Sequence, residues 1–166
     1  MQETHSAKKD QLQWEKQWGK KSNIFLNQGQ SNARGNAILF TNMDFTVTKY
    51  ADDSNGRIQV MAIKTPEHGK AILLINIYNE NNQTEQLALF EKLEQILGTF
   101  GDLTDHDIIF GGDFNLIFDR ELDSENVSGE LKLQSIAALT NIIEKYDLVD
   151  IYRVRNPNPE KKKIHL

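Results

Sequence analysis

The sequence predicts a mixed α+β fold in which helices cover layers of sheet. Two almost continuous apolar runs, residues 71–78 and 107–113, are typical of strands that are covered on both faces. Each run is followed by a segment whose apolar residues recur at helical spacing. Shorter alternating runs precede them and indicate further strands. This order of elements is typical of a layered α+β domain.

The first part of the chain is predicted to be mostly strand. A short helix is expected after Ser6, with Trp14 and Trp18 one turn apart and its lysines on a solvated face. Residues 23–40 then indicate a short strand, a polar loop and a second strand from Ala37 to Phe40. Residues 45–64 contain two alternating runs joined through Asn55-Gly56, which predicts a hairpin because both residues tolerate positive φ.

Two helices are predicted in the second part of the chain. The first follows the strand at 71–78, takes Asn82 or Thr84 as its cap and ends at Gly98. The second follows the strand at 107–113 and a loop rich in Asp, Glu and Ser. The apolar residues expected near one face of these helices are Leu87, Phe90, Leu93 and Leu97 in the first, and Ile136, Leu139, Ile143 and Tyr146 in the second.

Composition limits the classes of function. The chain has 166 residues, with 39% hydrophobic and 26% charged residues, which is the size and balance of one globular domain. It has no cysteine, no apolar stretch long enough for a membrane span and no secretory leader, so we expect an intracellular protein, nuclear or cytoplasmic, without disulfides. The formal net charge of −5 counts against coating of DNA by bulk attraction. It leaves open a nuclease whose carboxylates hold a cation.

The stretch "IIFGGDFNLIFD", residues 108–119, presents Asp113 and Asn115 at the end of an apolar run. One interpretation is a simple turn, because Gly, Asp and Asn are the usual turn residues. The other is a ligand site, because residues two apart on an extended backbone point to the same side. The strand at 71–78 also ends in a polar cluster, and ligand sites favour the carboxyl ends of strands. This coincidence favours the site.

Three segments of the sequence resemble the endonuclease/exonuclease/phosphatase superfamily. "IIFGGDFN" is similar to its Gly-Asp-x-Asn motif, "LINIYNENN" to the strand before it, and "MQETH" to its Gln-Glu-Thr-His segment. The order of "SNARGNAILF", "NGRIQVMAI" and "LVDIYRVRNPNP" resembles the endonuclease domain of long interspersed (non-LTR) retrotransposon reverse-transcriptase polyproteins.

The resemblance implies a partial four-layered α/β sandwich of the deoxyribonuclease-like type. It also implies hydrolysis of DNA phosphodiesters by a magnesium-dependent endonuclease, with Mn²⁺ possible in its place. Residues 1–166 are expected to form a single incomplete domain, because the first strand–helix unit and the C-terminal Asp and Ser-Asp-His segments of the family are not matched. The intact domain would bind DNA, whereas this chain is expected to be weak or inactive. The oligomeric state is left open.

The resemblance also assigns roles at matching positions. It gives Glu3 to the metal, Tyr78 to a phosphate oxygen, Asp113 to proton transfer or water orientation, and Asn115 to the phosphate. Each of these has a plain alternative: a solvated acid for Glu3, a packing aromatic for Tyr78 and a turn for the last two.

Three further residues are candidates for contact with the substrate. Asn81 would contact the substrate backbone, with helix capping as its rival, while Asn32 and Arg34 could touch DNA or simply belong to a polar loop. The four histidines, His5, His68, His106 and His165, match no family motif and are expected on the surface or in local packing.

Three functional classes remain open at this point. The chain is a DNA-nicking endonuclease, a relative that hydrolyses another phosphate ester, or a non-catalytic retrotransposon remnant.

Overall fold

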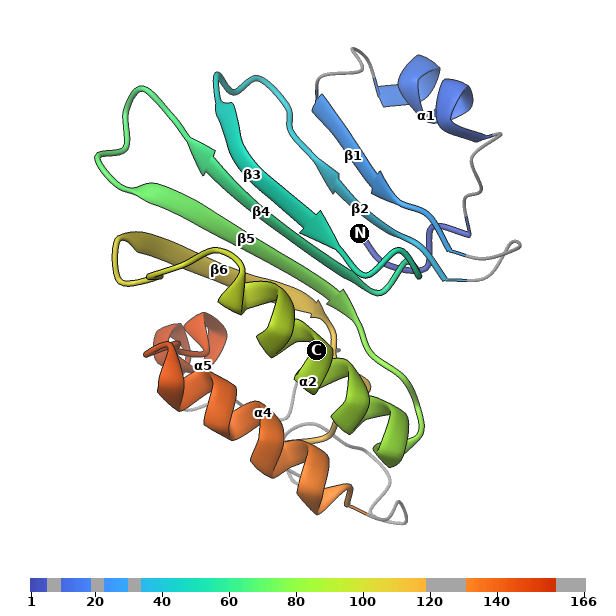
Figure 1. The fold of residues 1–166 in the computed structure, drawn as a ribbon, viewed down its shortest axis with the longest axis vertical. Coiled ribbons are helices and arrows are strands. Elements are labelled where there is room, and N and C mark those ends of the chain that lie inside the picture. Colours follow the sequence, from blue (N-terminus) through green and yellow to red (C-terminus); the bar gives the residue numbers. More distant parts are fainter. Residues whose placement is uncertain (6–9, 19–22, 30–33, 119–130, 158–166) are drawn as a thin grey trace.

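Two sheets form the centre of the computed structural model, which describes residues 1–5, 10–18, 23–29, 34–118 and 131–157 (Figure 1). β1 (Ile24–Asn27) and β2 (Asn36–Leu39) form a two-stranded antiparallel sheet. The four-stranded sheet has the order β3-β4-β5-β6. Its strands are β3 (Thr46–Asp52), β4 (Ile58–Lys64), β5 (Ala71–Tyr78) and β6 (His106–Asp113). Only the β5–β6 pair of this sheet is parallel.

Helices account for the remaining regular elements of the described residues. They are α1 (Gln11–Trp18), α2 (Gln83–Gly98), α4 (Leu133–Lys145) and α5 (Ile151–Arg155). α2 connects the parallel strands β5 and β6, which cannot be joined by a tight turn. Figure 1 shows α2 over the four-stranded sheet with α4 alongside it. The predicted α+β class is confirmed, whereas α5 was not predicted.

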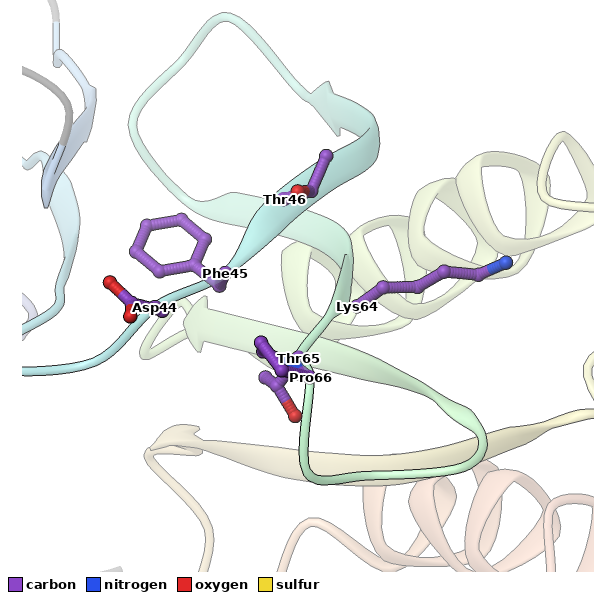
Figure 2. Close-up of a pocket in the computed structure, with 6 residues that line it drawn as sticks. All are labelled: Asp44, Phe45, Thr46, Lys64, Thr65 and Pro66. Carbon is purple, nitrogen blue, oxygen red and sulfur yellow. The ribbon is translucent and has the colours of Figure 1, made fainter.

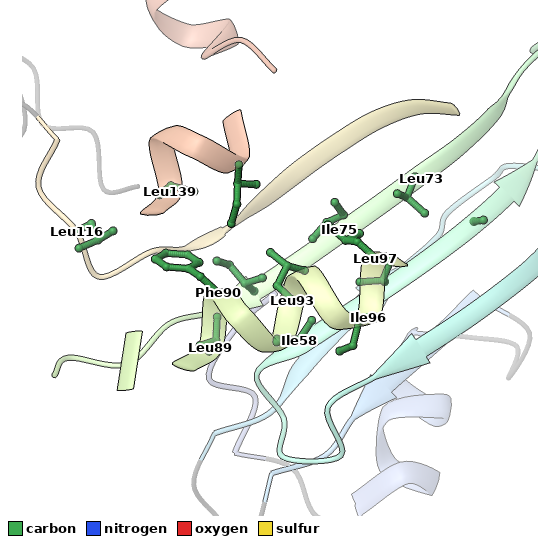
Figure 3. Close-up of a cluster of buried hydrophobic side chains, with 14 residues drawn as sticks. Ile58, Leu73, Ile75, Leu89, Phe90, Leu93, Ile96, Leu97, Leu116 and Leu139 are labelled. Carbon is green, nitrogen blue, oxygen red and sulfur yellow. The ribbon is translucent and has the colours of Figure 1, made fainter. Parts of the chain in front are cut away.

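The apolar core lies between the four-stranded sheet and α2 (Figure 3). Alternate residues of β4 and β5 face the helix: Ile58, Val60, Ala62, Leu73, Ile75 and Ile77. α2 contributes Leu89, Phe90, Leu93, Ile96 and Leu97. Each such large side chain contributes about 1.5–3 kcal/mol through burial. The predicted helix face is slightly rotated, because Leu87 is only half-buried while Leu89 and Ile96 enter the core.

The opposite face of the four-stranded sheet packs on β1 and β2 through polar side chains. Gln59 Nε2 donates to the Phe25 carbonyl at 3.0 Å, and Asn76 Nδ2 donates to the Ala37 carbonyl at 3.3 Å. Both amides are buried. The described residues thus form two layers of sheet and a layer of helices, as expected for part of an α/β sandwich.

β6 differs from the prediction of a strand covered on both faces. Its burial alternates, with Ile108 and Phe110 packed against the core and Ile109 58% exposed. The physical reason is that the β1–β2 layer does not extend over this face of β6. β2 packs on β4 and β5 rather than on the edge strand β6. The apolar composition of the run therefore overstated how much of β6 is buried.

The connections show three smaller differences. β2 begins and ends one residue earlier than the predicted strand at 37–40. The first helix was predicted to follow Ser6, which lies outside the described residues, and α1 begins at Gln11. The β3–β4 hairpin has positive φ at Ser54 and Gly56 rather than at Asn55. It is a wider loop than a two-residue turn.

Candidate functional site

The carboxyl ends of β5 and β6 lie side by side. Tyr78 and Asp113 are partners in the parallel register, and the Asn79 N–H donates to the Asp113 carbonyl at 2.8 Å. Parallel strands end at the same edge of a sheet, which is where α/β proteins commonly bind ligands. The polar clusters that follow the two apolar runs in the sequence therefore meet at one edge.

Gly112 permits this close approach. It has φ of +150°, and a Cβ at this position would lie 2.1 Å from the Ile77 carbonyl oxygen. A Cβ at Gly111 would meet nothing within 4 Å. The second glycine of the Gly-Gly pair is thus the one that the β5–β6 contact requires.

Asp113 and Asn115 are related by a turn. β6 ends at Asp113, and Asn115 has φ of 48°, so the extended-backbone reason for their convergence does not hold. Asp113 Oδ1 instead accepts the Asn115 N–H at 3.0 Å, as in an Asx turn. The Asn115 side chain then donates from Nδ2 to the Asn79 carbonyl at 2.8 Å. The turn interpretation is correct for the backbone, and this turn links the two strand ends.

Two residues that the sequence analysis missed hold this turn by donating to its Asn115 carbonyl. The Asn115 carbonyl accepts bonds from Gln86 Nε2 at 3.0 Å and from Lys132 Nζ at 3.2 Å. Gln86 also donates to the Glu80 carbonyl at 2.6 Å. Burial lowers the pKa of Lys132. Lys132 places an amine at the strand-end edge, although no local pattern in the sequence marks it.

The first residues of the chain reach the same edge. Thr4 N–H donates to the Gly35 carbonyl at 3.0 Å and His5 N–H to the Arg34 carbonyl at 2.9 Å. The Tyr78 hydroxyl donates to the Glu3 carboxylate. Burial, followed by the hydrogen bond to Glu3, raises the pKa of Tyr78 to about 12. Tyr78 is therefore a neutral hydrogen-bond donor at physiological pH.

A cluster of ion pairs also contacts Tyr78, through Arg57. Arg57 is 8% exposed, lies over the Tyr78 ring with Cζ 5.0 Å from the centroid, and donates from Nη1 to the Tyr78 carbonyl at 3.0 Å. Its guanidinium also pairs with Glu80, which in turn pairs with Arg34 Nη2 at 3.2 Å. The sequence analysis missed Arg57 and Glu80. Their contacts depend on the pairing of β4 with β5, which no local pattern in the sequence marks.

The predicted substrate-contact residues have different outcomes. Arg34 reaches the edge through Glu80, with 40% of its side chain exposed. Asn82 caps α2 by accepting from the N–H groups of Thr84 and Glu85, so the capping alternative for Asn81 is wrong. Asn81 itself is exposed. Asn32 lies outside the described residues, as does His165.

The oxygen atoms of the side chains at this edge fit a hard, hydrated cation. Among the residues that the structure describes, no group of three or more His, Cys, Asp or Glu side chains could hold a metal ion. Mg²⁺ commonly keeps several waters and uses one or two protein carboxylates together with substrate phosphates. A single carboxylate such as Glu3, with the Tyr78 oxygen beside it, suits that mode of binding.

Two hollows lie elsewhere on the described surface. One, of about 410 Å³, is lined by residues 44–46 and 64–66 (Figure 2). It is at the end of β3 and β4 opposite to Tyr78, because β4 runs antiparallel to β5. The other, of about 800 Å³, adjoins the amino end of β6 and is lined by residues that include His106 and Asp147. Neither contains the strand-end residues.

Comparison with known proteins finds a likeness to a transposon protein. No family model matches the sequence. The chain is 27% identical over 160 residues to the "Transposon TX1 uncharacterized 149 kDa protein" of Xenopus laevis, a match that covers 95% of this chain and 11% of that protein. This likeness confirms a resemblance to a transposon protein. The chain spans about a tenth of the length of this relative.

Solved structures show weaker likeness. Two structures of Caenorhabditis elegans TDP2 have TM-scores of 0.43 and 0.44 at 19% and 20% identity, and cover 68% of this chain and 47% and 36% of theirs. A β-hairpin deletion mutant of Staphylococcus aureus beta toxin has a TM-score of 0.43 at 8% identity, over 81% of this chain and 52% of the toxin. These values add nothing to the geometry described above. None of the described helices has the length and apolarity of a membrane span.

Proposed function

We propose that this chain carries part of the active site of a metal-dependent phosphodiesterase of retrotransposon origin, whose reaction is the nicking of DNA. The observation that carries the proposal is the meeting of Glu3, Tyr78, Asp113 and Asn115 at one sheet edge. These are the positions at which the sequence resembles the endonuclease/exonuclease/phosphatase motifs.

Each side chain has a chemical role in this proposal. Glu3 would hold Mg²⁺ or Mn²⁺, which when bound stabilises the charge that develops on the phosphate. Tyr78, a neutral donor, would turn its single O–H from Glu3 to a phosphate oxygen when the cation takes the Glu3 carboxylate. Asp113 orients the attacking water or accepts its proton, and the Asn115 amide donates to the phosphate. Arg34 and Asn81 bind the DNA backbone.

We expect the reaction of this chain to be slow. The sequence contains no Ser-Asp-His triplet, and no segment of it matches the first Asn-bearing strand of the family. Loss of one charge-stabilising donor alone commonly costs about 10²–10³ in rate. A non-catalytic remnant and a hydrolase of another phosphate ester are the alternatives.

A plasmid-nicking assay with Mg²⁺ tests the proposal. The chain is compared with Asp113→Ala and with the control Asp105→Ala, which removes an exposed carboxylate near the amino end of β6. We expect slow, Mg²⁺-dependent nicking that Asp113→Ala abolishes and Asp105→Ala preserves. Conversion by the unchanged chain at the rate of a protein-free sample would identify a non-catalytic remnant. Turnover of an RNA end or a phospholipid but not of DNA would identify the other hydrolase.

A further inference from the structure

Glu3 has a strained backbone that its surroundings must hold. Its φ is 50°, in the left-handed region, which costs a non-glycine residue about 1–2 kcal/mol. Such a conformation persists only where neighbouring contacts fix it. On the C-terminal side of Glu3, the backbone bonds of Thr4 and His5 to residues 34–35 provide these contacts. On the other side, Met1 pairs with Ala37 of β2 through its amino group, at 2.8 Å from the Ala37 carbonyl, and through its carbonyl, which accepts the Ala37 N–H at 2.9 Å. A side chain of β5 adds a second anchor there.

That side chain is Asn76. It lies two residues before Tyr78 on β5, so both side chains point to the sheet face away from α2. Asn76 Oδ1 accepts from Gln2 Nε2 at 2.7 Å, and its Nδ2 lies 3.4 Å from the Met1 carbonyl. Nδ2 also donates to Ala37 O at 3.3 Å and to Gln59 Oε1 at 3.2 Å. One buried amide thus ties the two residues before Glu3 to β2 and β4.

We propose that Asn76 is a positioning residue that fixes Met1 and Gln2 on β5, so that the Glu3 carboxylate stands beside Tyr78 in place to bind the cation. The inference rests on the proposed function for the metal role of Glu3. An amide is required at residue 76 because it must accept from Gln2 and donate to carbonyl oxygens at the same time. A carboxylate or an apolar side chain would leave some of these buried groups without a partner.

Binding of Mn²⁺ tests the proposal without relying on catalysis. Loss of a side chain that orients a metal ligand typically weakens metal affinity about 10–100-fold. We expect a weakening of this size in Asn76→Ala and a smaller one in Gln2→Ala, measured by the electron paramagnetic resonance signal of free Mn²⁺. Gln2→Ala removes the same hydrogen bond from a half-buried residue. It therefore remains informative if Asn76→Ala fails to fold.

Asn27→Ala is the matched control. Asn27 is also a buried amide at the strand pair, but it donates to Asp53 Oδ1 at 2.7 Å and to Ile58 O at 2.8 Å and accepts from the Gly56 N–H at 3.2 Å, so none of its partners belongs to residues 1–5. We expect this variant to lose stability without losing Mn²⁺ affinity. Equal Mn²⁺ affinity in the Asn76→Ala, Gln2→Ala and unchanged chains would overturn the proposal.

Amide hydrogen exchange separates this inference from the proposed function. Exchange at the Thr4 and His5 amides should accelerate in Asn76→Ala but not in Asn27→Ala. Unchanged exchange there in Asn76→Ala would show that Asn76 does not anchor the segment, whatever the metal does. Mn²⁺ binding is also measured in Glu3→Gln. If Glu3→Gln binds Mn²⁺ normally, the metal role of the proposed function fails, and the inference fails with it. If Glu3→Gln weakens binding while Asn76→Ala does not, the positioning inference alone is wrong.

Discussion

Tyr78 and Asp113 are register partners on two parallel strands, and their side chains are hydrogen-bonded to two different segments of the chain. The Tyr78 hydroxyl donates to Glu3 at the start of the chain, whereas Asp113 accepts the Asn115 N–H in the turn after β6. The strand pair thus brings together segments more than a hundred residues apart in sequence. Most of the site geometry depends on this one register.

The first prediction concerns the pH dependence of stability. Tyr78 has a pKa of about 12 in the folded chain, against 10.0 for an unperturbed tyrosine. Between these values the unfolded state has released the proton while the folded state keeps it, so stability falls as pH rises. The contribution of this shift is complete below the unfolded-state pKa and is lost as pH rises through the folded-state pKa.

Tyr78→Phe should therefore reduce the loss of stability in this pH window. The measurement is the free energy of unfolding in urea from about pH 10 to about pH 12. Tyr152→Phe, at an exposed tyrosine of α5, is the matched control. The same pH slope in Tyr78→Phe and in the unchanged chain would contradict the raised pKa that burial and the hydrogen bond to Glu3 give Tyr78.

The second prediction separates two neighbouring asparagines. Asn82→Ala removes the cap of α2 and should lower the free energy of unfolding by about 1 kcal/mol. Asn81→Ala should leave stability unchanged and weaken binding of a DNA duplex, because Asn81 is exposed and does not cap the helix. Chemical denaturation and fluorescence anisotropy with labelled DNA measure the two effects. A loss of stability in Asn81→Ala with unchanged DNA binding would reverse the assignment.

Local patterns predicted the elements that carry the site. The apolar runs at 71–78 and 107–113 predicted adjacent strands, and the structure pairs Tyr78 with Asp113 as expected. The cap of the following helix was predicted in the same way to be Asn82 or Thr84, and it is Asn82. These features depend on periodicity and on residue types within a few positions, which a single sequence contains.

The rest of the site depends on which distant segments meet. Arg57 pairs with Glu80 and stacks on Tyr78 only because β4 and β5 are antiparallel in a particular register. Asn76 contacts Gln2 only because β2 packs across β5. The uncovered face of β6 likewise depends on how far the β1–β2 layer extends. No local pattern encodes these distances, so sequence analysis could not find these residues.

The third prediction concerns the ion-pair cluster. Glu80→Gln would leave the Arg57 guanidinium, whose side chain is 10% exposed, without its charged partner. Breaking one side of a buried ion pair costs about 3 kcal/mol. Thermal and urea denaturation of Glu80→Gln should show a loss of this size, compared with less than about 0.5 kcal/mol for Glu91→Gln at an exposed position of α2. Equal losses in the two variants would show that Glu80 and Arg57 do not form a stabilising pair.

The last prediction compares the two glycines before Asp113. Gly112→Ala would place a Cβ 2.1 Å from the Ile77 carbonyl oxygen at a backbone φ of +150°, so β6 would have to move away from β5. Overpacking and backbone strain of this kind together cost on the order of 3 kcal/mol. Gly111→Ala meets no atom within 4 Å and should be tolerated.

The readout is the free energy of unfolding together with exchange protection of the Asn79 amide, which donates to the Asp113 carbonyl. We expect Gly112→Ala to lose both, because separating the strands breaks this bond, while Gly111→Ala keeps both. Gly112→Ala could be too unstable to be obtained as folded protein. If Gly111→Ala folds normally in the same preparation, that difference gives the same answer. Equal stability of the two variants, with the Asn79 amide protected in each, would mean that the close contact of the strand ends does not depend on Gly112.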